Sequence, residues 1–70
     1  MNLNQAVVGN VYTVKRIATE EAEMDAFLFS LGCYAGEPIT VVSRRKADCV
    51  VSIKDGRYTL DGQLASAIEV

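Results

Sequence analysis

The sequence contains no histidine, and its two cysteines, Cys33 and Cys49, lie far apart and form no CxxC pair. Histidine and closely spaced cysteines are the usual ligands of protein-bound zinc, and histidine is the common base that activates a nucleophile. Their absence excludes the common zinc templates and the histidine-dependent catalytic pairs. We therefore expect no metal site, no cofactor and no enzymatic activity. We expect both thiols to be small buried apolar side chains.

The sequence also lacks a long apolar run. The longest uncharged apolar stretch, residues 26–36, is about half as long as a membrane-spanning helix. Residues 1–6 contain no basic segment followed by an apolar one, so they do not form a secretory signal. These two absences predict a cytoplasmic protein.

Neither sign of charge is in strong excess. The chain of 70 residues has seven Lys and Arg against nine Asp and Glu, a formal net charge of −2, and 50% hydrophobic residues. This balance gives no electrostatic preference for a phosphate backbone, and it supplies enough apolar side chains for one packed core. We expect one folded domain over residues 1–70 that does not bind nucleic acid.

What the sequence does contain is a series of short β-rich runs around one helix-forming segment. Residues 9–17 begin with a Gly-Asn turn and continue through β-branched and aromatic residues, which predicts a first strand with an irregularity at Ile17. Residues 19–21 form a cap sequence for a helix, and Gly32 predicts the end of that helix. The helix carries one apolar stripe at the helical period. Its members are Met24, Phe27, Leu28 and Leu31.

Four further strands are predicted after the helix from short runs of β-branched and aromatic residues. They lie at residues 39–43, 49–53, 57–60 and 67–70. Three kinds of connection are expected between them. These are a basic loop at 44–48, a type I′ turn at Asp55-Gly56 with positive φ at both residues, and a single 3₁₀ turn at 61–65.

Five short strands, with one α-helix between the first two and a 3₁₀ turn before the last, predict a mostly β fold. The compact solution is a small five-stranded SH3-like barrel, in which two orthogonally packed sheets close on one core. The expected core residues are Val14, Leu28, Leu31, Ile39, Val41, Val51, Ile53, Leu60 and Ile68.

Three stretches of the sequence together carry a family resemblance. They are Gly9 with Tyr12 and Val14, the run LFSLGCYAGEPI at 28–39, and the closing YTL at 58–60 with LASAIEV at 64–70. With its Leu-x-x-Leu-Gly-x-x-x-Gly core, the chain resembles the FeoA-like domains, small cytoplasmic proteins of bacterial ferrous-iron transport systems. It departs from the family pattern at Ala35, where proline is common, and at Phe27, where a basic residue is common.

The resemblance implies an SH3-like barrel that docks on a GTPase-coupled ferrous-iron permease from the cytoplasmic side and modulates iron uptake. It implies no catalytic activity and contact with the membrane only through this partner. Weak self-association is left open. A similar barrel forms the C-terminal domain of iron-responsive bacterial repressors, but 70 residues leave no room for a helix-turn-helix domain as well.

An alternative function is a free-standing metal-sensing or nucleic-acid-binding module, because one fold can serve unrelated functions. In a metal sensor, Cys33, Cys49 and Asp48 would be the candidate ligands, although the sequence gives them no ligand spacing. The basic residues Lys15 and Arg16 have only Tyr12 nearby, whereas nucleic-acid binding favours several interleaved aromatic side chains. The accessory module is therefore the favoured interpretation.

Five residues are candidates for contact with a partner protein. Phe27 and Phe29 point about 200° apart on a helix, so one helix packed on one core cannot bury both rings. We expect an exposed phenylalanine beside Tyr34 to form a docking patch. Arg44 and Arg45 in the basic loop are candidates for contact with an acidic surface, the other interpretation being a solvated loop.

Overall fold

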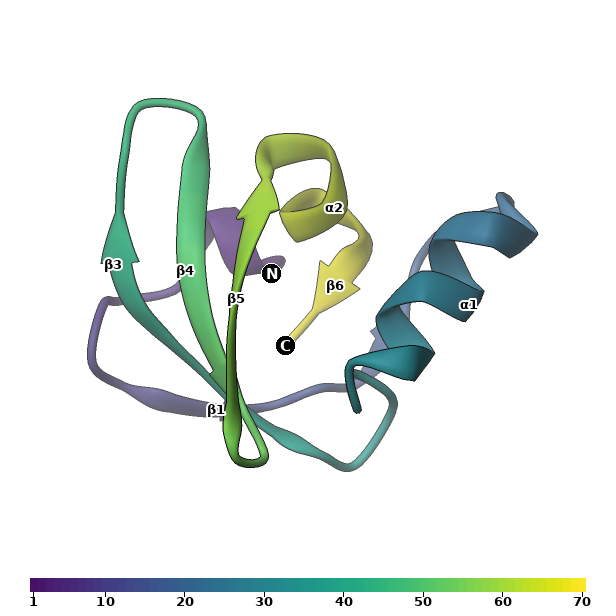
Figure 1. Cartoon of the computed structure of the whole chain (residues 1–70), viewed down its shortest axis with the longest axis horizontal. Coiled ribbons are helices and arrows are strands. Elements are labelled where there is room, and N and C mark those ends of the chain that lie inside the picture. Colours follow the sequence, from purple (N-terminus) through teal and green to yellow (C-terminus); the bar gives the residue numbers. More distant parts are fainter.

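The protein folds into two antiparallel sheets, as described for residues 1–70 by a computed structural model (Figure 1). The larger sheet has four strands in the order β1-β3-β4-β5, and the smaller sheet pairs β2 with β6. The strands are β1 (Val11–Thr13), β2 (Arg16–Ile17), β3 (Pro38–Arg44), β4 (Asp48–Ile53), β5 (Gly56–Asp61) and β6 (Ile68–Glu69).

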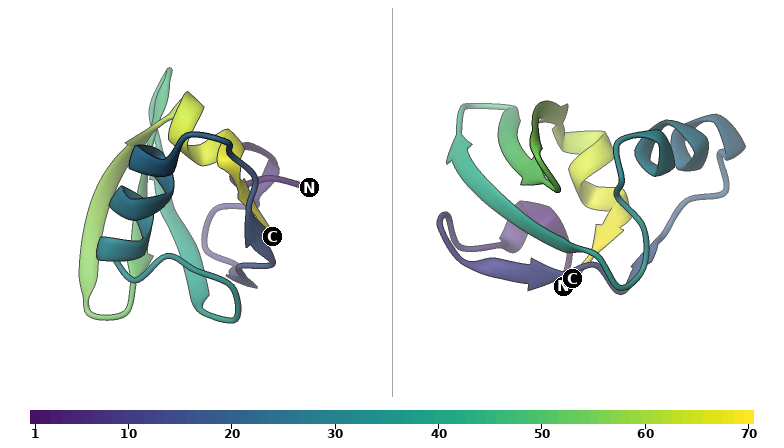
Figure 2. Two further views of the ribbon diagram at one scale, coloured as in Figure 1. Left: turned by 90° about the vertical axis from the view of Figure 1, so that its right-hand side faces the viewer. Right: turned by 60° about the horizontal axis from the view of Figure 1, so that its bottom comes forward.

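Three helical segments complete the fold. They are the 3₁₀ helix η1 (Leu3–Gln5), the α-helix α1 (Ala22–Ser30) and the α-helix α2 (Gly62–Ala67). Figure 2 shows that α1 projects to one side of the sheets, whereas α2 lies close to them. No helix is long and apolar enough to cross a membrane.

The predicted first strand is divided between the two sheets. β1 pairs with β3, whereas β2 pairs with β6. The chain changes sheets at Val14 and Lys15, whose N–H groups donate to the carbonyl groups of Glu37 (2.9 Å) and Glu69 (2.7 Å). The irregularity expected at Ile17 therefore lies earlier, at the point where the chain leaves one sheet for the other.

The predicted closure into a five-stranded barrel is wrong. β5 is an edge strand that pairs only with β4, so the four-stranded sheet stays open. The C-terminal strand does pair with the first predicted strand, through Ile17 with Ile68 and Arg16 with Glu69. This pairing forms the separate two-stranded sheet, and neither of its strands pairs with a strand of the larger sheet. The fold is mostly β, as expected.

The turn between β4 and β5 lies one residue earlier than predicted. Ile53 pairs with Gly56, so the two central residues are Lys54 and Asp55, and only Lys54 has a positive φ, of 52°. Gly56 belongs to the strand, where an added Cβ would collide with the ring of Tyr58. The need for space beside this ring, and not the turn conformation, explains the glycine.

Two helix starts also differ from the predictions. α1 begins at Ala22, because the Thr19 hydroxyl accepts the N–H of Glu21 (3.1 Å) in a turn that precedes the helix. The segment predicted as a 3₁₀ turn opens the short α-helix α2. There the Asp61 carboxylate accepts the N–H of Leu64 (2.8 Å), which is a side-chain N-cap.

The end of α1 is confirmed at Gly32, which has a φ of +90°. Its N–H donates to the carbonyl group of Phe29 (2.9 Å), and the N–H of Cys33 donates to that of Leu28 (2.9 Å). These two bonds form a Schellman motif, which satisfies helix carbonyls that have no partner within the helix.

The core lies between the two sheets, and η1, α1 and α2 each contribute one buried side chain to it. All of the expected core residues are buried except Leu31, which is partly buried. Both thiols are buried as expected, with Cys33 1% and Cys49 2% exposed. The other buried apolar side chains were not predicted, because they belong to the N-terminal segment and to the C-terminal region after β5. They are Leu3, Ala6, Ala65, Ala67 and Val70.

Leu28 anchors α1, since it is the one buried residue of this helix. We expect Leu28→Ala to lower the free energy of unfolding by about 2 to 5 kcal/mol through lost burial and an unfilled cavity. Phe27→Ala is the matched control on the same helix, with an expected loss below about 1 kcal/mol because this ring is exposed. Urea unfolding followed by circular dichroism measures both. Equal losses would contradict this account of how α1 is held.

Candidate docking surface

The two phenylalanines of α1 are both on the surface. Phe27 is 48% exposed and Phe29 is 64% exposed. The spacing of the two rings predicts at least one exposed ring. Both are exposed, because α1 reaches the core through Leu28 and only partly through Met24. The two rings lie on opposite sides of the helix, as their spacing requires.

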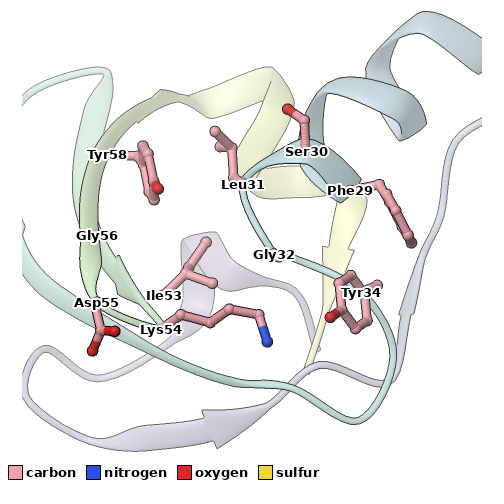
Figure 3. Close-up of a pocket in the computed structure, with 10 residues that line it drawn as sticks. All are labelled: Phe29, Ser30, Leu31, Gly32, Tyr34, Ile53, Lys54, Asp55, Gly56 and Tyr58. Atoms are coloured by element: carbon pink, nitrogen blue, oxygen red, sulfur yellow. The ribbon is translucent and has the colours of Figure 1, made fainter.

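Phe29 and Tyr34 form a stacked pair. Their ring centroids are 4.9 Å apart and their planes are tilted by 32°. The pair exists because Gly32 reverses the chain, which brings Tyr34 back beside the last turn of α1 (Figure 3). A ring held by a neighbouring ring has fewer rotamers to lose when a partner binds.

Lys54 extends this cluster from the turn between β4 and β5. Its Nζ lies 3.2 Å from Oε2 of Glu37 and 5.3 Å from the centroid of the Tyr34 ring. Its aliphatic stem crosses Gly32 so closely that a Cβ there would lie 2.8 Å from Cε. Hydrogen bonding to Glu37, and then to Tyr34, raises the pKa of Lys54. This side chain is therefore cationic at neutral pH.

An open pocket of about 580 Å³ lies between the C-terminal end of α1 and the β4–β5 turn (Figure 3). Leu31, Ile53 and Tyr58 give it apolar walls, and Phe29 with Tyr34 forms one side. Lys54 and Tyr58 were not predicted as part of this site, because nothing local in the sequence shows that the β4–β5 turn faces the end of α1.

The structure separates the five predicted contact residues. It brings Phe29 and Tyr34 together, and it places Phe27 on the other side of the same helix. Arg44 and Arg45 belong to the β3–β4 hairpin, which Figures 1 and 2 show at the end of the molecule remote from α1. One flat partner surface would not contact the aromatic pair and the basic loop together.

Arg44 makes contacts within the protein. Its Nη2 donates to the carbonyl oxygens of Leu3 (2.8 Å) and Ala6 (2.6 Å), so the guanidinium ties η1 to the hairpin. Charge-assisted hydrogen bonds of this kind are stronger than neutral ones. Arg45 makes no side-chain hydrogen bond and no ion pair, and it is exposed. Of the two arginines, only Arg45 is therefore free to contact a partner.

The cysteines are free thiols, and neither takes part in a group of metal ligands. No three His, Cys, Asp or Glu side chains come together as a cluster that could hold a metal ion. Burial raises the pKa of Cys33 to about 11. Burial also raises the pKa of Cys49, and the positive charge of Arg44 opposes this shift.

These features together define a small, mostly β domain with an exposed aromatic pair beside an open pocket. The FeoA domain matches residues 1–70, and the chain belongs to the FeoA domain family. This family is associated with ferrous-iron transport, and its members are non-catalytic accessory domains. The resemblance noted in the sequence is thereby confirmed.

Three solved structures share the fold. A manganese-dependent transcriptional repressor superimposes with a TM-score of 0.88 at 26% identity, over 97% of this chain and 39% of the repressor. The second structure is Stenotrophomonas maltophilia FeoA complexed with zinc, which is described as a prokaryotic SH3 domain protein. It superimposes with a TM-score of 0.87 at 19% identity, over 99% of this chain and 87% of that chain. An iron uptake regulatory protein (FeoA) superimposes with a TM-score of 0.84 at 21% identity, over 94% of this chain and 88% of that chain. No curated protein sequence matches the chain.

The two arginines of the basic loop should differ in their effect on stability. Arg44→Ala removes two charge-assisted hydrogen bonds and is expected to lower the free energy of unfolding by about 1 to 3 kcal/mol. Arg45→Ala is the matched control and should change it by less than about 0.5 kcal/mol. Urea titrations of both variants decide the question. If Arg44→Ala is as stable as the wild type, the contacts with η1 do not hold the N-terminal segment.

The buried thiol of Cys33 should make stability depend on pH above pH 9. Its pKa is about 11 in the folded protein and 9.0 for an unperturbed thiol, so the folded state keeps a proton that the unfolded state releases. The free energy of unfolding should therefore fall as the pH rises from 9 to 11, and it should fall less steeply in Cys33→Ala. Urea titrations of both proteins across this range measure the difference. Parallel profiles would show that burial does not perturb this thiol.

Proposed function

We propose that this domain docks on the GTPase-coupled ferrous-iron permease at its cytoplasmic side and modulates iron uptake. The contact surface is the C-terminal part of α1, with Phe27, Phe29 and Tyr34 as its aromatic residues. Contact with the membrane occurs only through the permease. The proposal is supported by the family association with ferrous-iron transport and, above all, by the exposed pair of Phe29 and Tyr34.

The exposed pair supports docking for an energetic reason. Phe29 leaves 64% of its surface in water, although a domain this small needs most of its apolar side chains for the core. Aromatic side chains in well-packed pockets contribute most of the free energy at protein interfaces. The stack on Tyr34 also orients the ring before a partner arrives, which lowers the entropy lost on binding.

The basic loop has a secondary part in this proposal. Arg45 is exposed and free of side-chain partners, and it belongs to the β3–β4 hairpin, which lies remote from α1 in Figure 1. Exposed charges outside the contact act through long-range electrostatic attraction and chiefly change the rate of association. Arg45 therefore steers the domain towards an acidic part of the permease, and Arg44 serves the fold.

A free-standing sensing or nucleic-acid-binding module is the second candidate function. It is supported by the likeness to the manganese-dependent repressor, of which this chain spans 39%. The described residues provide no cluster of metal ligands, and the basic residues Arg44, Arg45 and Lys46 have no aromatic residue among them on which a base could stack. The accessory function is thus the better supported of the two.

Docking is tested with purified permease in nanodiscs and with Phe29→Ser. An interface aromatic that is truncated commonly costs about 2 kcal/mol, so affinity should fall about 30-fold while the fold is retained. Val11→Ser is the matched control, because Val11 is 70% exposed but lies on β1, outside the pocket. Biolayer interferometry measures affinity and circular dichroism checks the fold. Equal affinities for Phe29→Ser and Val11→Ser would place the contact elsewhere.

A further inference from the structure

The helix α1 has almost no covering within this protein. Of its nine residues, Leu28 is buried and Met24 is partly buried, and the other seven are exposed. Helices shorter than about 12 to 15 residues are marginal in water, and in proteins they gain most of their stability from packing. Figure 2 shows the helix standing away from both sheets. Most of its surface is therefore available to a partner.

The outer face of α1 has the shape that a second helix requires. Ala22, Ala26 and Ser30 follow one another at four-residue spacing, so they form one ridge of small side chains. The Ser30 hydroxyl donates to the carbonyl group of Phe27 (2.6 Å), so burying it leaves no donor unsatisfied. Phe27 and Phe29 stand on either side of this ridge. A helix lying on the ridge would pack between the two rings.

The charged side chains of α1 and of the segment just before it are all acidic, and Lys54, the cation beside Phe29 and Tyr34, is paired with Glu37. Glu23 and Asp25 precede Phe27 and Phe29 by four residues, so each ring has a carboxylate one turn away on the same side of the helix. Glu20 and Glu21 lie just before the helix. None of the four carboxylates takes part in either ion pair of the protein. The chain contains no Lys or Arg between Arg16 and Arg44.

We propose that α1 packs against a basic amphipathic helix in the cytoplasmic part of the permease. This rests on the proposed function and names the chemistry of its contact. The partner helix places apolar side chains on the ridge of α1 and Lys or Arg beside Glu23 and Asp25. Cytoplasmic segments next to membrane-spanning helices carry an excess of Lys and Arg, so a permease has such segments. The same carboxylates repel an anionic lipid surface, which excludes direct docking of α1 on the membrane.

Charge reversal tests the electrostatic part of the proposal. Asp25→Lys and its control Asp48→Lys change the net charge equally, but Asp48 lies on the β3–β4 hairpin, remote from α1. With the permease in nanodiscs of phosphatidylcholine, Asp25→Lys should weaken binding at least about tenfold and Asp48→Lys less than about twofold. Raising the NaCl concentration should weaken binding by the wild type more than by Asp25→Lys. Equal affinities for the two variants would overturn the proposal.

Side-chain size tests the helix packing. Ala26→Leu keeps a strong helix former but fills the ridge, so it should weaken binding about tenfold, whereas Ala26→Ser should bind like the wild type. Circular dichroism confirms that both variants fold. A photoreactive benzoylphenylalanine at position 27 should crosslink to a cytoplasmic segment of the permease rich in Lys and Arg. Crosslinks confined to an acidic segment would overturn the proposal.

A different binding partner for α1, such as a second copy of the domain or a lipid surface, would give different experimental results. If the isolated domain dimerises in analytical ultracentrifugation and Ala26→Leu abolishes the dimer, α1 is a self-association surface and the proposal is wrong. Binding of the domain to phosphatidylglycerol vesicles through α1 would overturn it as well. If Phe29→Ser weakens binding to the permease but Asp25→Lys and Ala26→Leu do not, docking stands and only the basic helix is rejected. If the wild type does not bind the permease at all, the proposed function itself fails.

Discussion

The left-handed backbone at Gly32 is the constraint on which the end of α1, the core and the exposed aromatic pair all depend. A φ of +90° lets the Schellman motif close α1 and turn the chain at once. The next residue, Cys33, then enters the core, and Tyr34 returns beside Phe29. The stem of Lys54 occupies the space that a side chain at position 32 would need. Any other residue here would strain its own backbone and would displace the Lys54 side chain.

The size of the domain explains why so much of α1 is exposed. A chain of 70 residues buries a limited share of its surface. In this protein, most of the buried side chains belong to the two sheets, η1 and α2. α1 therefore contacts the core through little more than Leu28 and is held by its end structure. The consequence is an exposed helix with two aromatic rings and unpaired carboxylates. Such a helix adds little to the stability of the core, and its apolar surface is available to a partner.

The two ends of the molecule have different electrostatic character. The α1 end carries unpaired carboxylates, and the β3–β4 hairpin carries Arg45 and Lys46 without intramolecular partners. Asp48 and Asp61 lie beside Arg45 and Lys46, and Lys54 lies beside Tyr34, so neither end carries charge of one sign alone. Arg44 shows that position in a basic loop does not establish a role in binding, because its guanidinium bonds to carbonyl groups of the N-terminal segment.

Local chemistry in the sequence was sufficient to predict the strand-forming runs, the stop at Gly32, the buried thiols and most of the core, because each depends on side chains close together in the chain. Tertiary structure alone decided that the first strand divides at Val14, that the sheets stay open, and that Arg44 bonds to η1. It also decided that Lys54 lies between Glu37 and Tyr34. These outcomes depend on contacts between residues distant in sequence, whose geometry is set by how the two sheets pack. No local pattern encodes that packing.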